Sequence, residues 1–117
     1  MKDDRLFLVH ISECISRIER YTLGGKSAFL ADTLVQDAVI RNLQVLAESC
    51  MRLSAALKTA YPETDWQGIA GFRNILVHDY LGINRVRVWE IVTQHTPALK
   101  TEVQRMLNDL GPSAPQA

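Results

Sequence analysis

The sequence predicts an all-α protein, folded as an antiparallel bundle of four to five helices with short connections. Three observations predict this fold. Apolar residues recur at spacings of three and four, no segment alternates apolar and polar residues as a strand would, and glycine or proline separates the periodic stretches. The chain has 117 residues, 47% of them apolar, which is enough for one core but not for two. We therefore expect one helical domain over residues 1–110 and a disordered tail over residues 111–117.

The first helix is expected to run from Asp3 or Asp4 to Tyr21, with the two acids at the positive end of the helix dipole. Paired glycines in segment 22–27 are expected to end it in a turn. A lysine and a serine follow these glycines, as in a phosphate-binding loop, but Arg20 stands where such a loop needs its first glycine, and no strand precedes it. A turn with a solvated lysine is the better interpretation. The apolar face of this helix comprises Leu8, Ile11, Cys14, Ile15 and Ile18.

The second helix is expected to be long, from Asp32 to Ala60, and Pro62 stops it. Its apolar residues step by four and three, which is heptad spacing. A helix that is also apolar on other sides lies at the centre of a bundle or across the interface of a dimer. Because so short a chain is not expected to cover all the leucines of this face, the sequence favours a homodimer built on the second and third helices. The stepped residues are Val39, Leu43, Leu46, Cys50, Leu53 and Leu57.

The third helix is expected to begin near Thr64 or Asp65, with Thr64 and Gln67 forming a capping box, and to fade between His78 and Gly82. Its apolar residues are Trp66, Ile69, Ala70, Phe72, Ile75, Leu76 and Val77.

The fourth helix is expected to begin after Asn84, a good N-cap, with Ile83 and Val88 forming a hydrophobic staple across the cap. Pro97 then interrupts the chain or opens a short fifth helix that ends near Asp109. The expected core face of the fourth helix is Val86, Val88, Trp89, Ile91 and Val92.

Charge and composition exclude several classes of function. The 13 basic and 13 acidic residues balance, which excludes a general electrostatic attraction to nucleic acid or membrane but leaves room for a local basic site. No apolar run approaches the roughly 20 residues that span a bilayer, and the N-terminus does not resemble a signal peptide, so we expect a cytoplasmic protein. Cys14 and Cys50 are expected to be buried hydrophobes. The three histidines lack the spacing of metal ligands, and we expect no metal or other cofactor.

Polar residues crowd one otherwise apolar stretch, Gly71–Tyr80. Arg73 can bind a phosphate through its planar guanidinium, and His78 can transfer protons near neutral pH. Asn74 lies four residues before His78, so it can orient the imidazole or bind a ligand. Tyr80 lies seven residues after Arg73, on the same face of a helix.

The same stretch also has a purely structural interpretation. Arg73 can pair with an acid such as Glu48 or Asp79, while His78 and Tyr80 close the end of the helix. Residue types alone leave this alternative open.

Helix geometry adds a constraint on Arg73 and His78. At about 100° per residue, positions five apart lie about 140° apart around a straight helix, so the two side chains point in different directions. Either the helix unwinds at His78, which Gly82 makes plausible, or a second chain completes the site.

The stretch Arg-Asn-Ile-Leu-Val-His-Asp-Tyr at positions 73–80 resembles R-x4-H-x-Y, the signature of HEPN domains. The surrounding sequences AVIRNLQVLAES, YPETDWQGIAGFRNILVHDY and VWEIV resemble the HepT-type toxins of that superfamily. The resemblance covers roughly residues 1–108, and its most specific part is the ordered set Trp66, Gly71, Tyr80 and Trp89.

The resemblance implies four to five α-helices and a homodimer, in which the arginine and histidine of both subunits face a cleft at the twofold axis. It implies metal-independent cleavage of RNA, with Arg73 holding the scissile phosphate, His78 acting as general acid or base and Asn74 assisting placement. A second chain completing the site agrees with the 140° offset. Arg41 or Arg52 is expected to add positive charge to the cleft.

HepT-type toxins resemble one half of a type VII toxin–antitoxin pair, whose partner is an MntA-type nucleotidyltransferase. The resemblance implies that this partner transfers AMP from ATP to Tyr80, where the added charge competes with RNA for Arg73. An alternative is a HEPN dimer that binds nucleotide or a nucleotidyltransferase partner without cleaving RNA.

Overall fold

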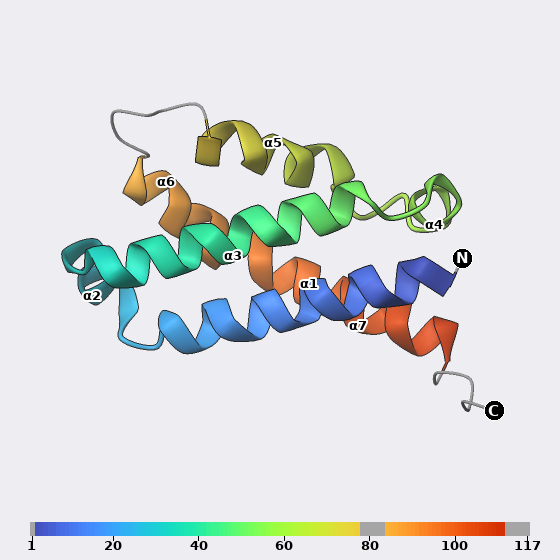
Figure 1. The fold of residues 1–117 in the computed structure, drawn as a ribbon, viewed down its shortest axis with the longest axis horizontal. Helices are drawn as coiled ribbons and strands as arrows, with labels where there is room; N and C mark the ends of the chain where they lie inside the picture. The colour runs from blue at the N-terminus through green and yellow to red at the C-terminus, as the bar shows by residue number, and fades with distance from the viewer. Residues whose placement is uncertain (1, 78–83, 112–117) are drawn as a thin grey trace.

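Two long helices, α1 (Lys2–Tyr21) and α3 (Thr33–Met51), lie side by side and antiparallel along the long axis of the molecule (Figure 1). The computed structural model describes residues 2–77 and 84–111. Helix α5 (Trp66–Val77) packs against α3, and α7 (Thr96–Leu110) packs against α1. The described residues contain no strand. The predicted all-α class and the antiparallel arrangement of the main helices are therefore confirmed.

The core lies between α1 and α3 and continues beneath α5 and α7. All the residues of the predicted apolar face of α1 are buried, as are both cysteines. The leucines of α3 and the segment after it are also covered within one chain: Leu43 and Leu46 are 0% exposed, Leu53 is 4% and Leu57 is 8%. The prediction that a single chain could not cover them was wrong: all four are buried within one chain, and α1 and α5 both pack against α3. These leucines therefore give no reason to expect a homodimer.

The predicted helix over residues 32–60 is two helices. The first, α3, ends at Met51, and the second, α4 (Ala55–Ala60), follows after a break at residues 52–54. Ser54 has an extended backbone, and its hydroxyl accepts a hydrogen bond from the backbone N–H of Leu57 at 3.1 Å, which caps α4. Leu53 and Leu57 still reach the core, so the spacing of apolar residues continues through the break. The sequence pattern therefore did not reveal where the helix ends.

A short helix, α2 (Gly25–Ala31), lies where only a turn was expected. The turn itself occupies residues 22–24, and Gly25 has a φ of +88°, a conformation that glycine adopts without strain. Lys26 lies in the first turn of α2 and is exposed, in agreement with a solvated lysine. Asp32 ends α2 and caps α3, since its carboxylate accepts hydrogen bonds from the backbone N–H groups of Leu34 and Val35.

Helix α5 begins one or two residues later than expected, and its cap is Asp65. The Asp65 carboxylate accepts a hydrogen bond from the N–H of Gly68 at 2.9 Å. Thr64, predicted as part of a capping box with Gln67, is instead buried, and its hydroxyl has no hydrogen-bond partner among the described residues. Thr64 and Asp65 both carry an oxygen that can accept a hydrogen bond from a free backbone N–H in the first turn of α5. In the structure the carboxylate of Asp65 accepts it.

Asn84 caps α6 (Arg85–Glu90) as predicted, with its side-chain oxygen accepting from the N–H of Arg87 at 3.1 Å. Val88 is buried, but Val86, predicted on the core face, is 47% exposed. In so short a helix, Val86 lies on the face opposite the core. The partner proposed for Val88 in the staple, Ile83, lies outside the described residues.

Pro97 does not interrupt the chain but opens a further helix, the second of the two predicted alternatives, and this helix ends at Leu110, one residue beyond the expected end near Asp109. A π-helical turn, η1 (Ile91–His95), joins α6 directly to α7, with Pro97 in the first turn of α7. Proline has no N–H for the helical ladder, and the wider turn before it keeps the chain helical. The Thr96 hydroxyl adds a 3.2 Å hydrogen bond to the carbonyl of Ile91.

Gly111 caps the C-terminus of α7 with a φ of +75°, and its carbonyl accepts a hydrogen bond from Arg5. The rest of the predicted disordered tail, residues 112–117, lies outside the described residues. Within the described part of the chain, no helix is both long and apolar enough to span a bilayer.

Candidate active site

Helix α5 presents the first half of the R-x4-H-x-Y motif. Its buried face consists of Ile69, Phe72 and Leu76, which are spaced by three and four residues and are at most 5% exposed. This face packs against the core, so Arg73 and Asn74 lie on the exposed side of the helix. The packing of α5 thus fixes the position of Arg73 without burying its charge.

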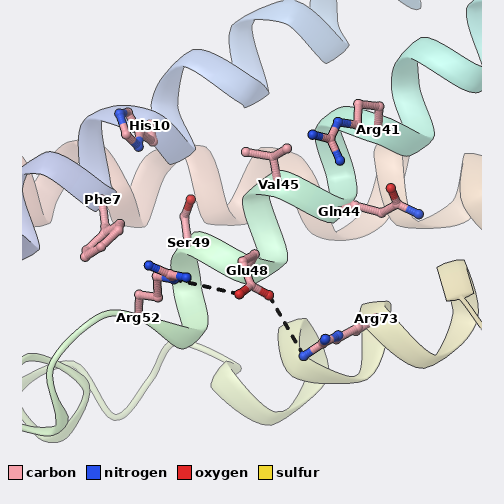
Figure 2. A pocket seen from close by; sticks show the side chains of 9 residues that line it. All are labelled: Phe7, His10, Arg41, Gln44, Val45, Glu48, Ser49, Arg52 and Arg73. Atoms are coloured by element: carbon pink, nitrogen blue, oxygen red, sulfur yellow. Dashed lines mark ion pairs between the residues drawn. The ribbon is translucent and has the colours of Figure 1, made fainter.

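Arg73 lines a pocket of about 590 Å³ between α1, α3 and α5 (Figure 2). Three arginines surround it: Arg41 from α3, Arg52 immediately after α3, and Arg73 from α5. Arg41 and Arg52 therefore both line the same pocket as Arg73 within a single chain, while their place in a cleft between two subunits stays a prediction. The remaining lining residues are Phe7, His10, Gln44, Val45, Glu48 and Ser49.

One carboxylate, that of Glu48, lies between two of the arginines. Its Oε1 lies 3.7 Å from Nε of Arg52, and its Oε2 lies 3.9 Å from Nη1 of Arg73. The three side chains are between 49% and 63% exposed, and such exposed pairs stabilise a fold by at most about 1 kcal/mol. The structural alternative, in which Arg73 pairs with Glu48, is therefore present as a contact. The contact is too weak and too exposed to account for three arginines around one pocket.

Arg41 has no such partner. It is exposed, and it forms no ion pair or hydrogen bond with the rest of the described chain. Three arginines against one carboxylate leave the pocket with a formal charge of +2. The protein as a whole is neutral, so this positive charge is local and is balanced by acids elsewhere on the chain.

His78, Asp79 and Tyr80 lie outside the described residues, as does the point at which the helix was expected to unwind. Of the predicted site, the structure therefore describes Arg73 and Asn74. Arg73 lines the pocket, whereas Asn74 is exposed on α5 and is not among the lining residues. The last residue of α5, Val77, directly precedes His78 in the chain.

Sequence reasoning missed the contribution of α1 to this pocket. Phe7 and His10 lie one turn apart on α1, with their rings in edge contact and their centroids 6.4 Å apart. His10 interrupts an apolar stretch, which marks it as surface-facing, but no local signal connects the N-terminal helix with Arg73. Only the packing of α1 beside α3 brings them to the same pocket (Figure 2).

The cysteines take no part in this site. Burial raises the pKa of the Cys50 thiol to about 12 and also raises the pKa of Cys14, so both stay protonated and unreactive near neutral pH. Neither lines the arginine pocket. Over residues 2–77 and 84–111, no group of three or more His, Cys, Asp or Glu side chains is arranged to hold a metal ion.

Comparisons with known proteins agree with the motif. Residues 11–106 match the family described as "Ribonuclease HepT-like". The chain is 36% identical over 110 residues to a Methanocaldococcus jannaschii protein named "Putative RNase", and the match covers 93% of this chain and 91% of that protein. It is 32% identical over 101 residues to "Probable ribonuclease HepT" of Thermococcus cleftensis, covering 86% of this chain and 92% of that one.

A third relative is larger. It is a Methanocaldococcus jannaschii protein named "Gamma-glutamylcyclotransferase and putative RNase", 33% identical over 110 residues. The match covers 93% of this chain and 50% of that protein, so the chain spans about half the length of this relative. No solved structure matches the chain.

Proposed function

Because the chain belongs to the HepT-like family, described as ribonuclease HepT-like, we propose that it is an endoribonuclease and the toxin of a toxin–antitoxin pair. Residues 1–110 form its HEPN domain, and it acts in the cytoplasm as a homodimer. One observation carries the proposal: Arg73 of the R-x4-H-x-Y motif is exposed on the wall of a pocket that two further arginines line. Relatives named as RNases support it.

The reaction uses the RNA's own 2′-hydroxyl as nucleophile. Arg73 binds the scissile phosphate and stabilises the charge that develops on it, since a guanidinium can donate two parallel hydrogen bonds to phosphate oxygens. His78 removes the proton of the 2′-hydroxyl or donates one to the leaving 5′-oxygen, and Asn74 positions the substrate. This mechanism needs no metal ion, and DNA resists it because the nucleophile is missing.

A homodimer completes this site. In a straight helix Arg73 and His78 would diverge by about 140°, and we infer that a second chain, rather than unwinding of the helix, brings an arginine and a histidine to the same phosphate. In the dimer, the arginine of one subunit works with the histidine of the other. Sedimentation of the purified chain should give about twice the mass of 13.2 kDa, and a monomer at micromolar concentration would remove the composite site.

The catalytic proposal is tested by cleavage of a mixed-sequence RNA by the purified chain in the presence of EDTA. Wild-type protein should yield fragments with 2′,3′-cyclic phosphate ends and leave the 2′-deoxy counterpart intact. Arg73→Ala and His78→Ala should each lower the rate by about 100-fold or more without unfolding the chain. Arg87→Ala is the matched control, because Arg87 is 60% exposed and also lies 3.9 Å from a carboxylate, that of Glu90.

Two outcomes would contradict this proposal. Full activity in a folded His78→Ala protein would exclude its role in proton transfer. No RNA cleavage by the wild-type dimer would favour the alternative, a HEPN dimer that binds nucleotide or a partner without cleaving RNA.

An MntA-type nucleotidyltransferase neutralises the toxin in this proposal. The phenolic oxygen of Tyr80 attacks the α-phosphorus of ATP, pyrophosphate leaves, and the phenol loses its proton. The new phosphodiester carries about one negative charge near Arg73 and competes with RNA. Treatment with ATP and the partner enzyme should add about 329 Da per AMP, and Tyr80→Phe should abolish the addition. The same mass gain on Tyr80→Phe would move the modification to another residue.

A further inference from the structure

The stripe of α3 that runs from Arg41 to Arg52 faces the same pocket as Arg73. We infer that this stripe is a second phosphate-binding subsite, which holds the backbone of a single-stranded RNA beside the reacting phosphate, and that Glu48 competes with RNA for it. The inference rests on the proposed function, since it assumes that RNA reaches Arg73. It adds residues, charge and a competing group that the R-x4-H-x-Y motif does not contain.

Arg52 follows the last residue of α3 and keeps helical backbone angles (φ −86°, ψ −7°), so helix geometry still places it on the same side as Arg41. Arg41 and Arg52 are eleven residues apart, so they differ by only about 20° around the helix and lie roughly 16 Å apart along it. Glu48 is seven residues after Arg41 and falls on the same stripe. The distance between the two arginines along the helix is longer than a single phosphate group. It suits successive phosphates of an extended strand better than a single bound ion.

The charge of the pocket matches such a strand. It holds three arginines and one glutamate, which leaves ten basic and twelve acidic residues on the rest of the neutral chain. The pocket therefore attracts a polyanion more strongly than the rest of the surface, whose formal charge is −2. Arg41, which has no partner among the described residues, keeps its donors available for a phosphate oxygen.

The opposite wall offers a surface for bases. Phe7 is partly buried against the core and His10 is exposed, and both rings border the pocket from α1 (Figure 2). Proteins that bind single strands combine a cationic track with aromatic rings on which bases stack. With arginines on α3 and rings on α1, the pocket has both parts, which favours an RNA strand over an inorganic anion.

Glu48 occupies the place that a phosphate would take between Arg52 and Arg73. Its distances of 3.7 and 3.9 Å are longer than the 2.7–2.9 Å typical of a charge-assisted hydrogen bond. A phosphate can approach both guanidinium groups more closely and displace this carboxylate. Glu48 therefore weakens RNA binding in the free protein, and its removal strengthens that binding.

The test is fluorescence anisotropy with a labelled 2′-O-methyl RNA of about ten nucleotides, which the protein can bind but cannot cleave. Arg41→Ala and Arg52→Ala should each weaken binding by about fivefold to tenfold and reduce the salt slope of log K by about 0.7. Glu48→Gln should tighten binding by about threefold to tenfold. The matched controls are Arg87→Ala and Glu90→Gln, an exposed pair at 3.9 Å that does not line this pocket.

The outcomes separate this inference from the proposed function. If Arg41→Ala and Arg52→Ala bind like Arg87→Ala while the wild type cleaves RNA, the subsite is wrong and the ribonuclease stands. If both variants lose binding but the wild type never cleaves RNA, the subsite stands and the catalytic proposal fails. Equal binding of free AMP and the oligonucleotide would also overturn the subsite, since a strand should bind through several phosphates. Thermal unfolding followed by circular dichroism should show that each exposed variant stays folded.

Discussion

Both carboxylate oxygens of Asp4 accept hydrogen bonds from Ser54, a residue fifty positions away in the chain. Oδ1 accepts from the backbone N–H at 2.8 Å, and Oδ2 accepts from the hydroxyl at 2.6 Å. Asp4 is only 3% exposed, so this carboxylate is a buried joint between the first turn of α1 and the break after α3. The same serine hydroxyl caps α4, and the joint therefore fixes the end of the pocket wall that carries Arg52.

Replacing this carboxylate should destabilise the protein. Asp4→Ala removes both hydrogen bonds to Ser54 and leaves a partly buried N–H and hydroxyl without this acceptor, which costs about 1–3 kcal/mol of unfolding free energy. Asp3→Ala is the control, because Asp3 is exposed and also lies in the first turn, where it loses only the dipole interaction. Urea unfolding measures the loss of unfolding free energy in both variants. Equal losses for the two variants would mean that the joint with Ser54 contributes nothing.

Leucines of α3 should differ strongly in their contribution to stability. Leu46→Ala empties a site that is 0% exposed and should lower the unfolding free energy by about 2–5 kcal/mol. Leu34→Ala, on the same helix but 78% exposed, should change it by less than about 0.5 kcal/mol. Thermal melts over a range of protein concentrations provide the measurement. A large loss for Leu34→Ala that depends on concentration would instead place Leu34 in an interface between copies.

Stability should fall above pH 9 because of Cys50. Burial raises the pKa of its thiol from near 9 to about 12 in the folded chain, so the folded state holds this proton more tightly than the unfolded state. The protonated Cys50 thiol contributes its full share to the free energy of unfolding below pH 9. This share is lost as the pH rises towards about 12, by at most about 1.4 kcal/mol per pH unit.

The comparison for Cys50 is Cys50→Ala, measured by urea unfolding at several pH values. The variant should lose less stability than the wild type as the pH rises above 9. Cys14, whose pKa burial also raises, is present in both proteins, so the difference between them reports the thiol of Cys50 and its interaction with Cys14. Parallel pH profiles would show that the thiol of Cys50 ionises as readily in the folded chain as in the unfolded one.

Mixed dimers test the composite site directly. Arg73→Ala and His78→Ala proteins should each be inactive alone. After co-refolding, the mixed dimer has one chain with an intact His78 and one with an intact Arg73, and activity should return to roughly half the wild-type value for that fraction. Gel-based RNA cleavage measures the recovery. If mixing restores nothing although mixed dimers form, each site draws both residues from one chain.

The class of the fold and the position of its main helices could be predicted from the sequence alone. Apolar residues spaced by three and four have to face a common core, so the extent of α1 and the buried faces of α1, α3 and α5 followed from periodicity. Asn84 was recognisable as a cap because its side chain competes locally for a free N–H. The motif around Arg73 was also readable, since its residue types and spacing are local features.

Tertiary structure decided what local spacing does not contain. The break before α4 depends on Asp4, fifty residues away, which stabilises an extended Ser54 inside a continuous apolar pattern. The coverage of Leu43 and Leu46 within one chain depended on how α1 and α5 pack on α3. The pocket likewise joins Arg41, Arg52 and Arg73 to His10 only because three helices meet there. Hydrogen bonds and contacts between distant segments produce no repeating pattern of residues in the sequence. Only the packing of the helices therefore shows that these residues lie together.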